Sequence, residues 1–251
     1  MTIRVAHLSD LHAEANSAAV LDGRRPAETL RATLDAFAAD GPIDLIILSG
    51  DVSNDATAES YAWVADLVRQ HAPVTRWLAG NHDLPALMEE PQLLATGGAS
   101  IGQWDYLPIA THLPDRHDGG IGAEQLSTLD SMLTAREDRF VVFGIHHPPL
   151  NEICPLADCQ VEDGHALLEL ITRHRCVRAV ISGHLHREFA IERDEVQFLG
   201  APSTWLQINH DPAYEPHYVP TAEPPAGREL LLHDDGTLEA RIIVAEMANE
   251  A

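Results

Sequence analysis

The sequence predicts an α/β protein whose sheets mix parallel and antiparallel strands. Up to residue 187, short apolar runs of strand length alternate with segments whose apolar residues recur at helical spacing. After residue 187 the pattern changes to strand pairs joined by short turns. No linker-like stretch divides the 251 residues, of which 45% are hydrophobic. We therefore expect one domain over residues 1–251, large enough to bury a substantial core.

Five apolar runs predict buried strands, and they cover residues 3–8, 43–48, 74–79, 139–145 and 177–182. The segments between them predict amphipathic helices over residues 26–40, 57–71, 122–133 and 163–174. Thr57 and Asp163 are expected to cap their helices, because short polar side chains accept hydrogen bonds from the free N–H groups of the first turn. Pro26 suits a first helical turn, where no N–H is needed.

The C-terminal part of the chain predicts two antiparallel hairpins. They cover residues 187–208 and 228–244, and the second turns at Asp234–Gly236. The proline-rich segment between them, residues 209–227, is expected to be a loop.

Charge narrows the function classes. The formal net charge is −23, and all 16 basic residues are arginine. A surface this acidic repels polyanions, so we expect no binding to long nucleic acid. A small anionic substrate is still compatible with a locally positive site.

No apolar run approaches the length of a membrane span, and the first residues already read as a strand rather than as a signal peptide. We therefore expect a cytoplasmic protein without a membrane span. The sequence does not decide the oligomeric state and leaves a homodimer open.

The three cysteines are Cys154, Cys159 and Cys176. An odd number of cysteines in a protein expected to be cytoplasmic argues against a disulfide framework. The spacing of the first two is wide for a zinc-binding pair, and no second pair exists. We therefore expect a loop that carries two free thiols.

Polar side chains follow each of the five predicted strands. In chain order they are Asp10 and His12, then Asp51, then Asn81, His82 and Asp83, then His146 and His147, and finally His184 and His186. Each group taken alone is typical of a turn. Together they predict a site, because functional side chains in open α/β sheets collect at the carboxyl ends of strands.

The residue types predict a pair of divalent metals. In an extended chain, residues i and i+2 point to the same side, so His184 and His186 could face one cavity, as could Asp10 and His12. Carboxylate, imidazole and amide oxygen ligands suit Mn, Fe, Zn or Co. If one aspartate bridges, seven side chains supply four contacts to each of two metals and leave positions open for water and substrate.

The order Asp-x-His, Gly-Asp, Gly-Asn-His-Asp, His, Gly-His-x-His resembles the calcineurin-like metallophosphoesterases over nearly the whole chain. The resemblance implies a four-layer α-β-β-α sandwich with two mixed sheets. It also implies that one metal is held by Asp10, His12 and His186, the other by Asn81, His146 and His184, with Asp51 bridging. For the His-His pair it favours His146, and we would add His147 only if the structure places it among the ligands.

Several segments resemble the branch of cyclic-nucleotide phosphodiesterases and glycerophosphodiesterases. They are residues 49–61, 146–149, 200–209 and 224–239. The resemblance implies hydrolysis of a small phosphodiester by attack of a metal-bound hydroxide. Residues 150–164, which help to shape the substrate mouth in that branch, show no family pattern.

Three further residues are expected near the substrate. His82 would stand by the leaving group as a proton donor or phosphate contact, with Asp83 orienting its ring. The alternative for His82 is a hydrogen-bond donor behind the ligands. Asn54 and Asn81 would contact phosphate, although Asn54 alone also fits a simple turn. The other histidines and Trp205 are expected to be packing or surface residues.

Rival functions use the same residues. A phosphomonoesterase or nucleotide pyrophosphatase could employ the same metals, and a non-enzymatic scaffold could share the fold. Scaffold relatives lose ligands, whereas this chain retains all seven. Monoesters carry an extra negative charge, and Arg187 is the only arginine beside a motif. Because Arg187 would point away from His186 in a continuing strand, diesters are favoured.

Overall fold

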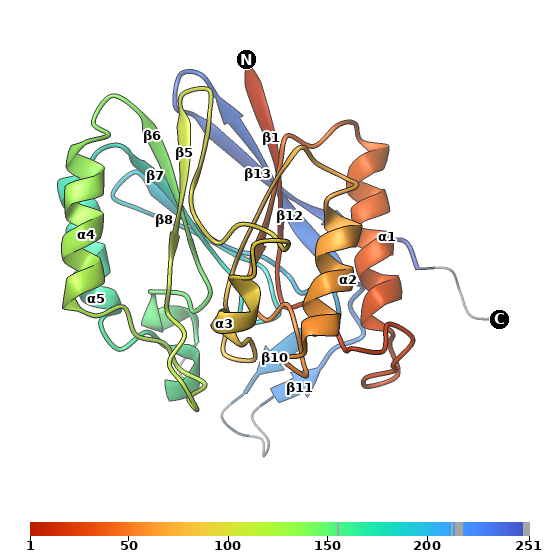
Figure 1. Cartoon of the computed structure of the whole chain (residues 1–251). Helices are drawn as coiled ribbons and strands as arrows, with labels where there is room; N and C mark the ends of the chain where they lie inside the picture. The colour runs from red at the N-terminus through yellow and green to blue at the C-terminus, as the bar shows by residue number, and fades with distance from the viewer. Residues whose placement is uncertain (155, 212, 214–217, 248–251) are drawn as a thin grey trace.

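The structure, a computed structural model, describes residues 1–154, 156–211, 213 and 218–247. Two sheets lie face to face, and helices cover the outer face of each (Figure 1). The first sheet has the order β13-β12-β1-β2-β3, formed by β1 (Thr2–Leu8), β2 (Leu45–Ser49), β3 (Val74–Leu78), β12 (Ala226–His233) and β13 (Leu238–Val244). The second has the order β4-β5-β6-β7-β9-β8, formed by β4 (Ala99–Ile101), β5 (Trp104–Ile109), β6 (Phe140–Ile145), β7 (Val177–Ser182), β8 (Phe189–Arg193) and β9 (Val196–Gly200).

The helices complete four layers. They are α1 (Pro26–Ala39) and α2 (Ala58–Val68) on one side, and α4 (Ala123–Thr134) and α5 (Gly164–Arg173) on the other (Figure 1). This arrangement confirms the predicted sandwich. Both sheets are mixed, since β1, β2 and β3 are parallel while β12 and β13 are antiparallel to their neighbours. In the second sheet, β5, β6, β7 and β9 are parallel.

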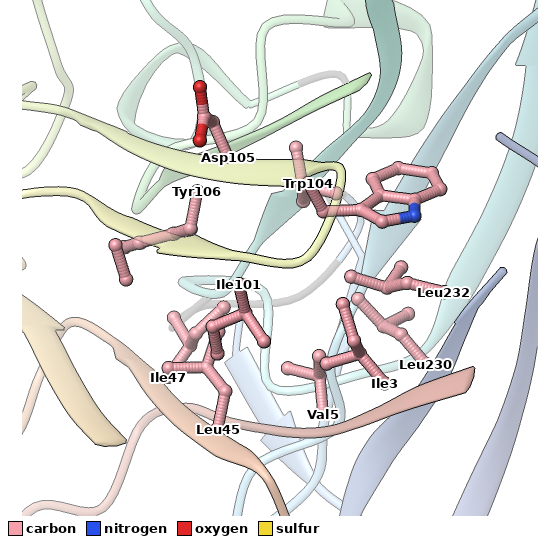
Figure 2. Close-up of a pocket in the computed structure, with 12 residues that line it drawn as sticks. Ile3, Val5, Leu45, Ile47, Ile101, Trp104, Asp105, Tyr106, Leu230 and Leu232 are labelled. Atoms are coloured by element: carbon pink, nitrogen blue, oxygen red, sulfur yellow. The ribbon is translucent and has the colours of Figure 1, made fainter. Parts of the chain in front are cut away.

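A layer of apolar side chains fills the space between the sheets. Figure 2 shows Ile3, Val5 and Leu230 of the first sheet facing the second, from which Trp104 projects. The indole N–H of Trp104 donates to the carbonyl of His233 at 2.8 Å, so its polar atom is paired inside the core. The cavity that remains there is about 10 Å³, too small to separate the sheets with a water layer. The two sheets are therefore packed directly on each other.

The helix ends test the predicted caps. Thr57 caps α2 by accepting from the backbone N–H of Ser60 at 3.2 Å, and Pro26 begins α1. Asp163 does occupy the N-cap position of α5, but its side chain makes no capping hydrogen bond. Its carboxylate instead accepts from the N–H groups of Ile121 and Gly122, at 2.9 and 2.7 Å, and so fastens the segment before α4.

Both predicted hairpins are present, as β8–β9 and β12–β13. The sequence missed β4, β5 and the short helix α3 (Pro85–Met88), because they are short or, in β5, interrupted by a charge and a proline. The segment predicted as a loop carries a two-stranded sheet of β10 (Ile208–His210) and β11 (Tyr218–Pro220). Across the described residues, no helix combines the length and the apolar character needed to cross a membrane.

The expectation of two free thiols is wrong, because Cys154 and Cys159 form a disulfide. Two 3-10 turns, η1 (Asn151–Ile153) and η2 (Ala157–Cys159), bring the two Cα atoms to 6.1 Å, and both cysteines are buried in the core under this loop. Cys176 is a free, buried thiol. A count of cysteines cannot reveal a pairing that depends on how one loop turns.

Candidate metal centre

The carboxyl ends of five strands meet in one pocket of about 400 Å³. Strands β1, β2 and β3 of the first sheet and β6 and β7 of the second end here, at the side of the sandwich where β10 and β11 lie (Figure 1). The predicted ligands follow these strand ends, and they are Asp10, His12, Asp51, Asn81, His146, His184 and His186. The topology thus brings side chains as far apart in the sequence as residues 10 and 186 into one site.

Asp51 lies between two groups of these residues. Its Oδ1 atom is 3.4 Å from Nε2 of His146, and its Oδ2 atom is 3.7 Å from Nε2 of His12. The backbone N–H of His82 also donates to Oδ1 at 2.9 Å, which fixes the carboxylate. One oxygen therefore faces each group, which is the orientation that a bridging carboxylate needs.

The first group consists of Asp10, His12, Asp51 and His186, whose ligand atoms all lie within 4.8 Å of one another. The Nε2 atoms of His12 and His186 are 3.0 Å apart, and Asp10 Oδ1 is 3.5 Å from His186 Nε2. All four residues are buried. Two imidazole nitrogens this close must share either an N–H hydrogen or a metal, because two facing lone pairs repel.

The hydrogen bonds of three histidines decide which ring nitrogen faces the site. The Nδ1 atoms of His146 and His186 lie 2.7 and 2.8 Å from the carbonyls of Ser49 and Leu206. Nε2 of His184 lies 2.9 Å from the carbonyl of Asp158. A carbonyl only accepts, so each of these nitrogens carries the hydrogen, and the opposite nitrogen offers a lone pair when the ring is neutral. The donor set therefore fits divalent metals.

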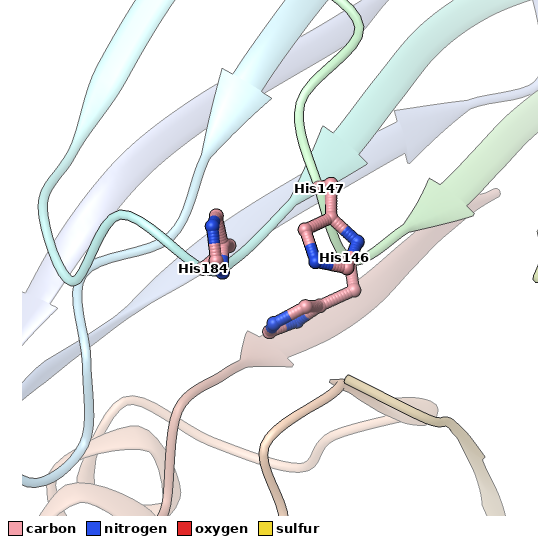
Figure 3. A group of neighbouring side chains, drawn as sticks. All are labelled: His146, His147 and His184. Atoms are coloured by element: carbon pink, nitrogen blue, oxygen red, sulfur yellow. The ribbon is translucent and has the colours of Figure 1, made fainter. Parts of the chain in front are cut away.

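The second group contains His146, His184 and Asn81, whose Oδ1 is 3.2 Å from Nε2 of His146. His147 lies beside them (Figure 3). However, its Nδ1 pairs with the hydroxyl of Thr111 at 2.8 Å and its Nε2 with the carbonyl of His117 at 2.9 Å. Both nitrogens are used, so His147 supports the group and is not a ligand candidate.

Electrostatics also fit a cation site. Burial opposes a charge on His146, but the Asp51 carboxylate outweighs it and raises the pKa of His146 to about 9. Burial and the charge of His146 lower the pKa of His184 to about 3. The buried carboxylate of Asp51 thus draws positive charge to the position between the two groups.

The backbone at the ligands differs from the prediction. Asp10, His12, Asp51, His184 and His186 all have positive φ, between 47° and 70°. The expectation that each Asp-x-His or His-x-His pair is extended is therefore wrong, although the paired side chains do reach one site. Left-handed backbone costs a non-glycine residue free energy, and residues held there cluster at functional sites.

Two glycines allow the close approach. A Cβ atom on Gly80 would lie 2.2 Å from Asp51 Oδ1, and one on Gly50, whose φ is 101°, would lie 2.3 Å from His146 Nδ1. Any side chain at either position would displace a ligand.

The sequence matches the calcineurin-like phosphoesterase family over residues 3–188. The chain belongs to the calcineurin-like phosphoesterases. It is therefore a hydrolase of phosphoric esters.

Curated relatives of this calcineurin-like phosphoesterase support the predicted branch. It is 30% identical to a 3′,5′-cyclic-nucleotide phosphodiesterase of Nostoc, covering 96% of this chain and 92% of the relative. It is also 30% identical to the 3′,5′-cyclic adenosine monophosphate phosphodiesterase CpdA of Pseudomonas aeruginosa, covering 96% and 89%. The resemblance to the cyclic-nucleotide phosphodiesterases is confirmed.

Solved structures agree on the fold. A dimetal phosphatase from Danio rerio superposes with a TM-score of 0.64 at 14% identity, covering 97% of this phosphoesterase and 99% of that chain. A purple acid phosphatase from yellow lupin seeds superposes with a TM-score of 0.66 at 14% identity, covering 96% and 51%. At these identities the likeness shows the shared architecture.

Asp83 of this phosphoesterase does not have the role expected for it. Its buried carboxylate accepts from the hydroxyl of Tyr61 at 3.1 Å and from three backbone N–H groups, those of Val52, Ser53 and Gly80. Among the hydrogen bonds of the described residues, none joins Asp83 to the ring of His82. Asp83 therefore ties the loop after β2 to the loop after β3 and does not orient His82. Burial and the charge of Asp51 raise its pKa to about 7.

His82 and Asn54 both line the pocket. The exposed ring of His82 lies edge-on to His12, with ring centroids 4.8 Å apart, so it stands beside the first metal group. Asn54 is at the pocket, but its Nδ2 donates to Glu14 at 2.6 Å. Its second N–H and its amide oxygen are left for other contacts.

Among the pocket residues that were not expected to take part in the site are two with aromatic rings, His117 and Trp205. His117 lines it, and its Nδ1 lies 3.5 Å from Nδ2 of Asn81. Trp205 packs on His12, with ring centroids 4.9 Å apart, and also faces the pocket. His117 follows no predicted strand, so the strand-end rule could not find it. The proline-rich segment also contains His217, which lies outside the described residues.

Proposed function

We propose that this protein hydrolyses a small phosphodiester, specifically a cyclic nucleotide, at a centre of two divalent metals. The observation that carries the proposal is Asp51, whose two oxygens face two separate groups of ligands. The names of the relatives from Nostoc and Pseudomonas aeruginosa support a cyclic nucleotide as the substrate.

The ligand sets follow the two groups. One metal would be held by Asp10, His12 and His186, the other by Asn81, His146 and His184, and both by Asp51. Mn, Fe, Zn and Co all suit such ligands. When bound, two such metals lower the pKa of a bound water and neutralise charge on phosphoryl oxygens.

The chain supplies the remaining steps. The amide of Asn81 and the exposed ring of His82 would contact the phosphate, and Asn54 lines the same pocket. His82 would also give a proton to the leaving oxygen, and its backbone N–H donates to Asp51. Asp83 would support the reaction only by joining the loop after β2 to the loop after β3.

A phosphomonoesterase or nucleotide pyrophosphatase is the second candidate. Enzymes that prefer monoesters gain from an extra cation near the phosphate. In the described part of the chain, no arginine lines the pocket, and Arg187 donates to the carbonyl of Ile153 and lines a neighbouring hollow. The absence of this cation favours diesters. A scaffold role has less support, since all seven ligands are kept.

The function is proposed for a single chain. Every ligand comes from this chain, and nothing in the described structure supports the homodimer that the sequence left open.

The test is direct comparison of substrates. Metal-free protein is reconstituted with Mn and assayed on bis(p-nitrophenyl) phosphate, p-nitrophenyl phosphate and the 2′,3′- and 3′,5′-cyclic nucleotides. We expect the highest kcat/KM on a diester. Faster turnover of the monoester would reject the diesterase assignment in favour of the second candidate.

A further inference from the structure

One further acidic residue, Asp158, lines the pocket from the loop that follows β6. Asp158 lies in the disulfide-closed loop, directly before Cys159, and it is half-buried at the pocket wall. Its carboxylate accepts from the hydroxyl of Tyr218 on β11. Its main-chain carbonyl, by contrast, holds Nε2 of His184 at 2.9 Å. The side chain and the main chain of Asp158 therefore have separate contacts.

Among the described residues that line the pocket, no arginine offsets the charge of Asp158. The other carboxylate that lines it, Asp51, faces the two metal groups. Among the described lining residues there is no arginine, and the sequence has no lysine. His210 packs edge-on against Tyr218 near Asp158, but burial and the charge of Arg187 lower its pKa to about 4 and keep it neutral. An anionic substrate that binds at the proposed metals therefore also meets the negative charge of Asp158, which no arginine or lysine among the described lining residues offsets.

We propose that Asp158 determines specificity by favouring singly charged phosphodiesters over doubly charged phosphomonoesters. The proposal rests on the proposed function. A diester has one negative charge, whereas a monoester has close to two at neutral pH, because its second pKa is about 6. Like charges in a partly desolvated pocket repel, so the additional charge of a monoester is disfavoured. The product of diester hydrolysis is itself a monoester, so the same charge favours its departure.

Two substitutions separate charge from packing. Asp158→Asn removes the charge, but it keeps the main-chain carbonyl at His184 and an oxygen that can accept from Tyr218. Tyr218→Phe removes that hydroxyl and leaves the charge in place. Glu152→Gln is the matched control, because Glu152 is an exposed acid of η1, just before the disulfide-closed loop, that pairs with Arg193 and does not line the pocket.

The experiment measures kcat/KM of the Mn-loaded enzymes for bis(p-nitrophenyl) phosphate and p-nitrophenyl phosphate, and the Kd of adenosine 5′-monophosphate by calorimetry. For Asp158→Asn we expect the diester-to-monoester ratio to fall on the order of tenfold and the nucleotide to bind more tightly by a similar factor. We expect Glu152→Gln and Tyr218→Phe to keep the wild-type ratio. The wild-type ratio should also fall as salt is raised, because screening weakens the repulsion.

An unchanged ratio in Asp158→Asn, in an enzyme that still hydrolyses the diester, would overturn the proposal. An equal change in Tyr218→Phe would also overturn it, since selectivity would then come from the placement of β11 and not from charge. A wild-type enzyme that prefers monoesters would instead overturn the proposed function, and the two failures are distinguishable.

Discussion

Oδ1 of Asp51 lies 3.4 Å from Nε2 of His146, and both side chains are buried. The other oxygen of the same carboxylate faces His12 in the first group. The two metal positions that we propose therefore share one residue, and changes at Asp51 should affect both.

Asp51→Asn tests the shared residue. Its amide nitrogen cannot act as a ligand, so only one group keeps an oxygen and the charge between the groups is lost. We expect both metals to bind weakly and kcat/KM to fall by at least about 100-fold. Metal content after gel filtration, measured by mass spectrometry, checks this. Full occupancy by two metals would contradict the bridging role.

Gly80→Ala tests the close approach at the centre. The added Cβ would lie 2.2 Å from Asp51 Oδ1 and 2.4 Å from the backbone nitrogen of Asp51. We expect a loss of roughly 1–3 kcal/mol in unfolding free energy, as overpacking costs, together with weaker metal binding.

The matched control for Gly80 is Gly97→Ala, where a Cβ would have no neighbour within 4 Å. Both variants are compared by denaturant titration and by metal content. Equal effects of the two substitutions would show that crowding at Asp51 is not the cause.

His7 should make stability depend on pH. It is fully buried, its Nε2 pairs with the hydroxyl of Ser49 at 2.7 Å, and its cross-strand neighbour is Arg228. Burial, with the positive charge of Arg228, lowers the pKa of His7 from 6.5 to about 3. Protonation is thus easier in the unfolded chain. The contribution of neutral His7 to the free energy of unfolding is complete above pH 6.5. It is lost as pH falls towards 3, by up to about 1.4 kcal/mol per pH unit.

His7→Gln is expected to flatten this dependence, while His165→Gln, at an exposed position, should leave it unchanged. Urea titrations of the metal-free proteins between pH 4 and 8 measure the difference from wild type. Parallel curves for wild type and His7→Gln would reject the assignment.

The disulfide should stabilise the wall of the pocket. It closes a loop between positions five residues apart, and the loop-closure entropy predicts a stabilisation of about 2 kcal/mol. We expect the double variant Cys154→Ser/Cys159→Ser to unfold at lower denaturant and to bind metal more weakly, because the same loop carries the carbonyl that holds His184.

A reducing agent provides the control for the disulfide. A dithiol should lower the Tm of the wild type to that of the double variant and should not change the variant. A wild-type Tm that does not respond to reduction, with free thiols counted at three, would mean that Cys154 and Cys159 are not paired.

The strand-end rule predicted the ligands because it depends on topology. Parallel strands bring Asp10, Asp51 and Asn81 to one edge whatever the details of their turns. The backbone of those turns could not be predicted in the same way. Positive φ at His184 and His186 follows from contacts that join distant segments, such as the N–H of His184 donating to Asp10 at 3.0 Å.

Residues whose role depends on a partner far away in sequence were misjudged. Asp83 looked like a neighbour of His82, yet it is bound to the loop 30 residues earlier. Asp163 stands at the cap position of the helix that follows it, yet its carboxylate binds a segment before α4. In both cases a short polar residue fitted the local sequence pattern. The tertiary structure then determined which N–H and O–H groups donate to its carboxylate.

Each proposed metal takes ligands from both sheets. The group of Asp10 and His12 from the first sheet is completed by His186 from the second, and Asn81 from the first is joined by His146 and His184 from the second. A bound cation would therefore act as a cross-link between the two halves of the sandwich. Separation of the sheets and release of the metals would be one event, so metal loading should sharpen the cooperativity of unfolding as well as raise its midpoint.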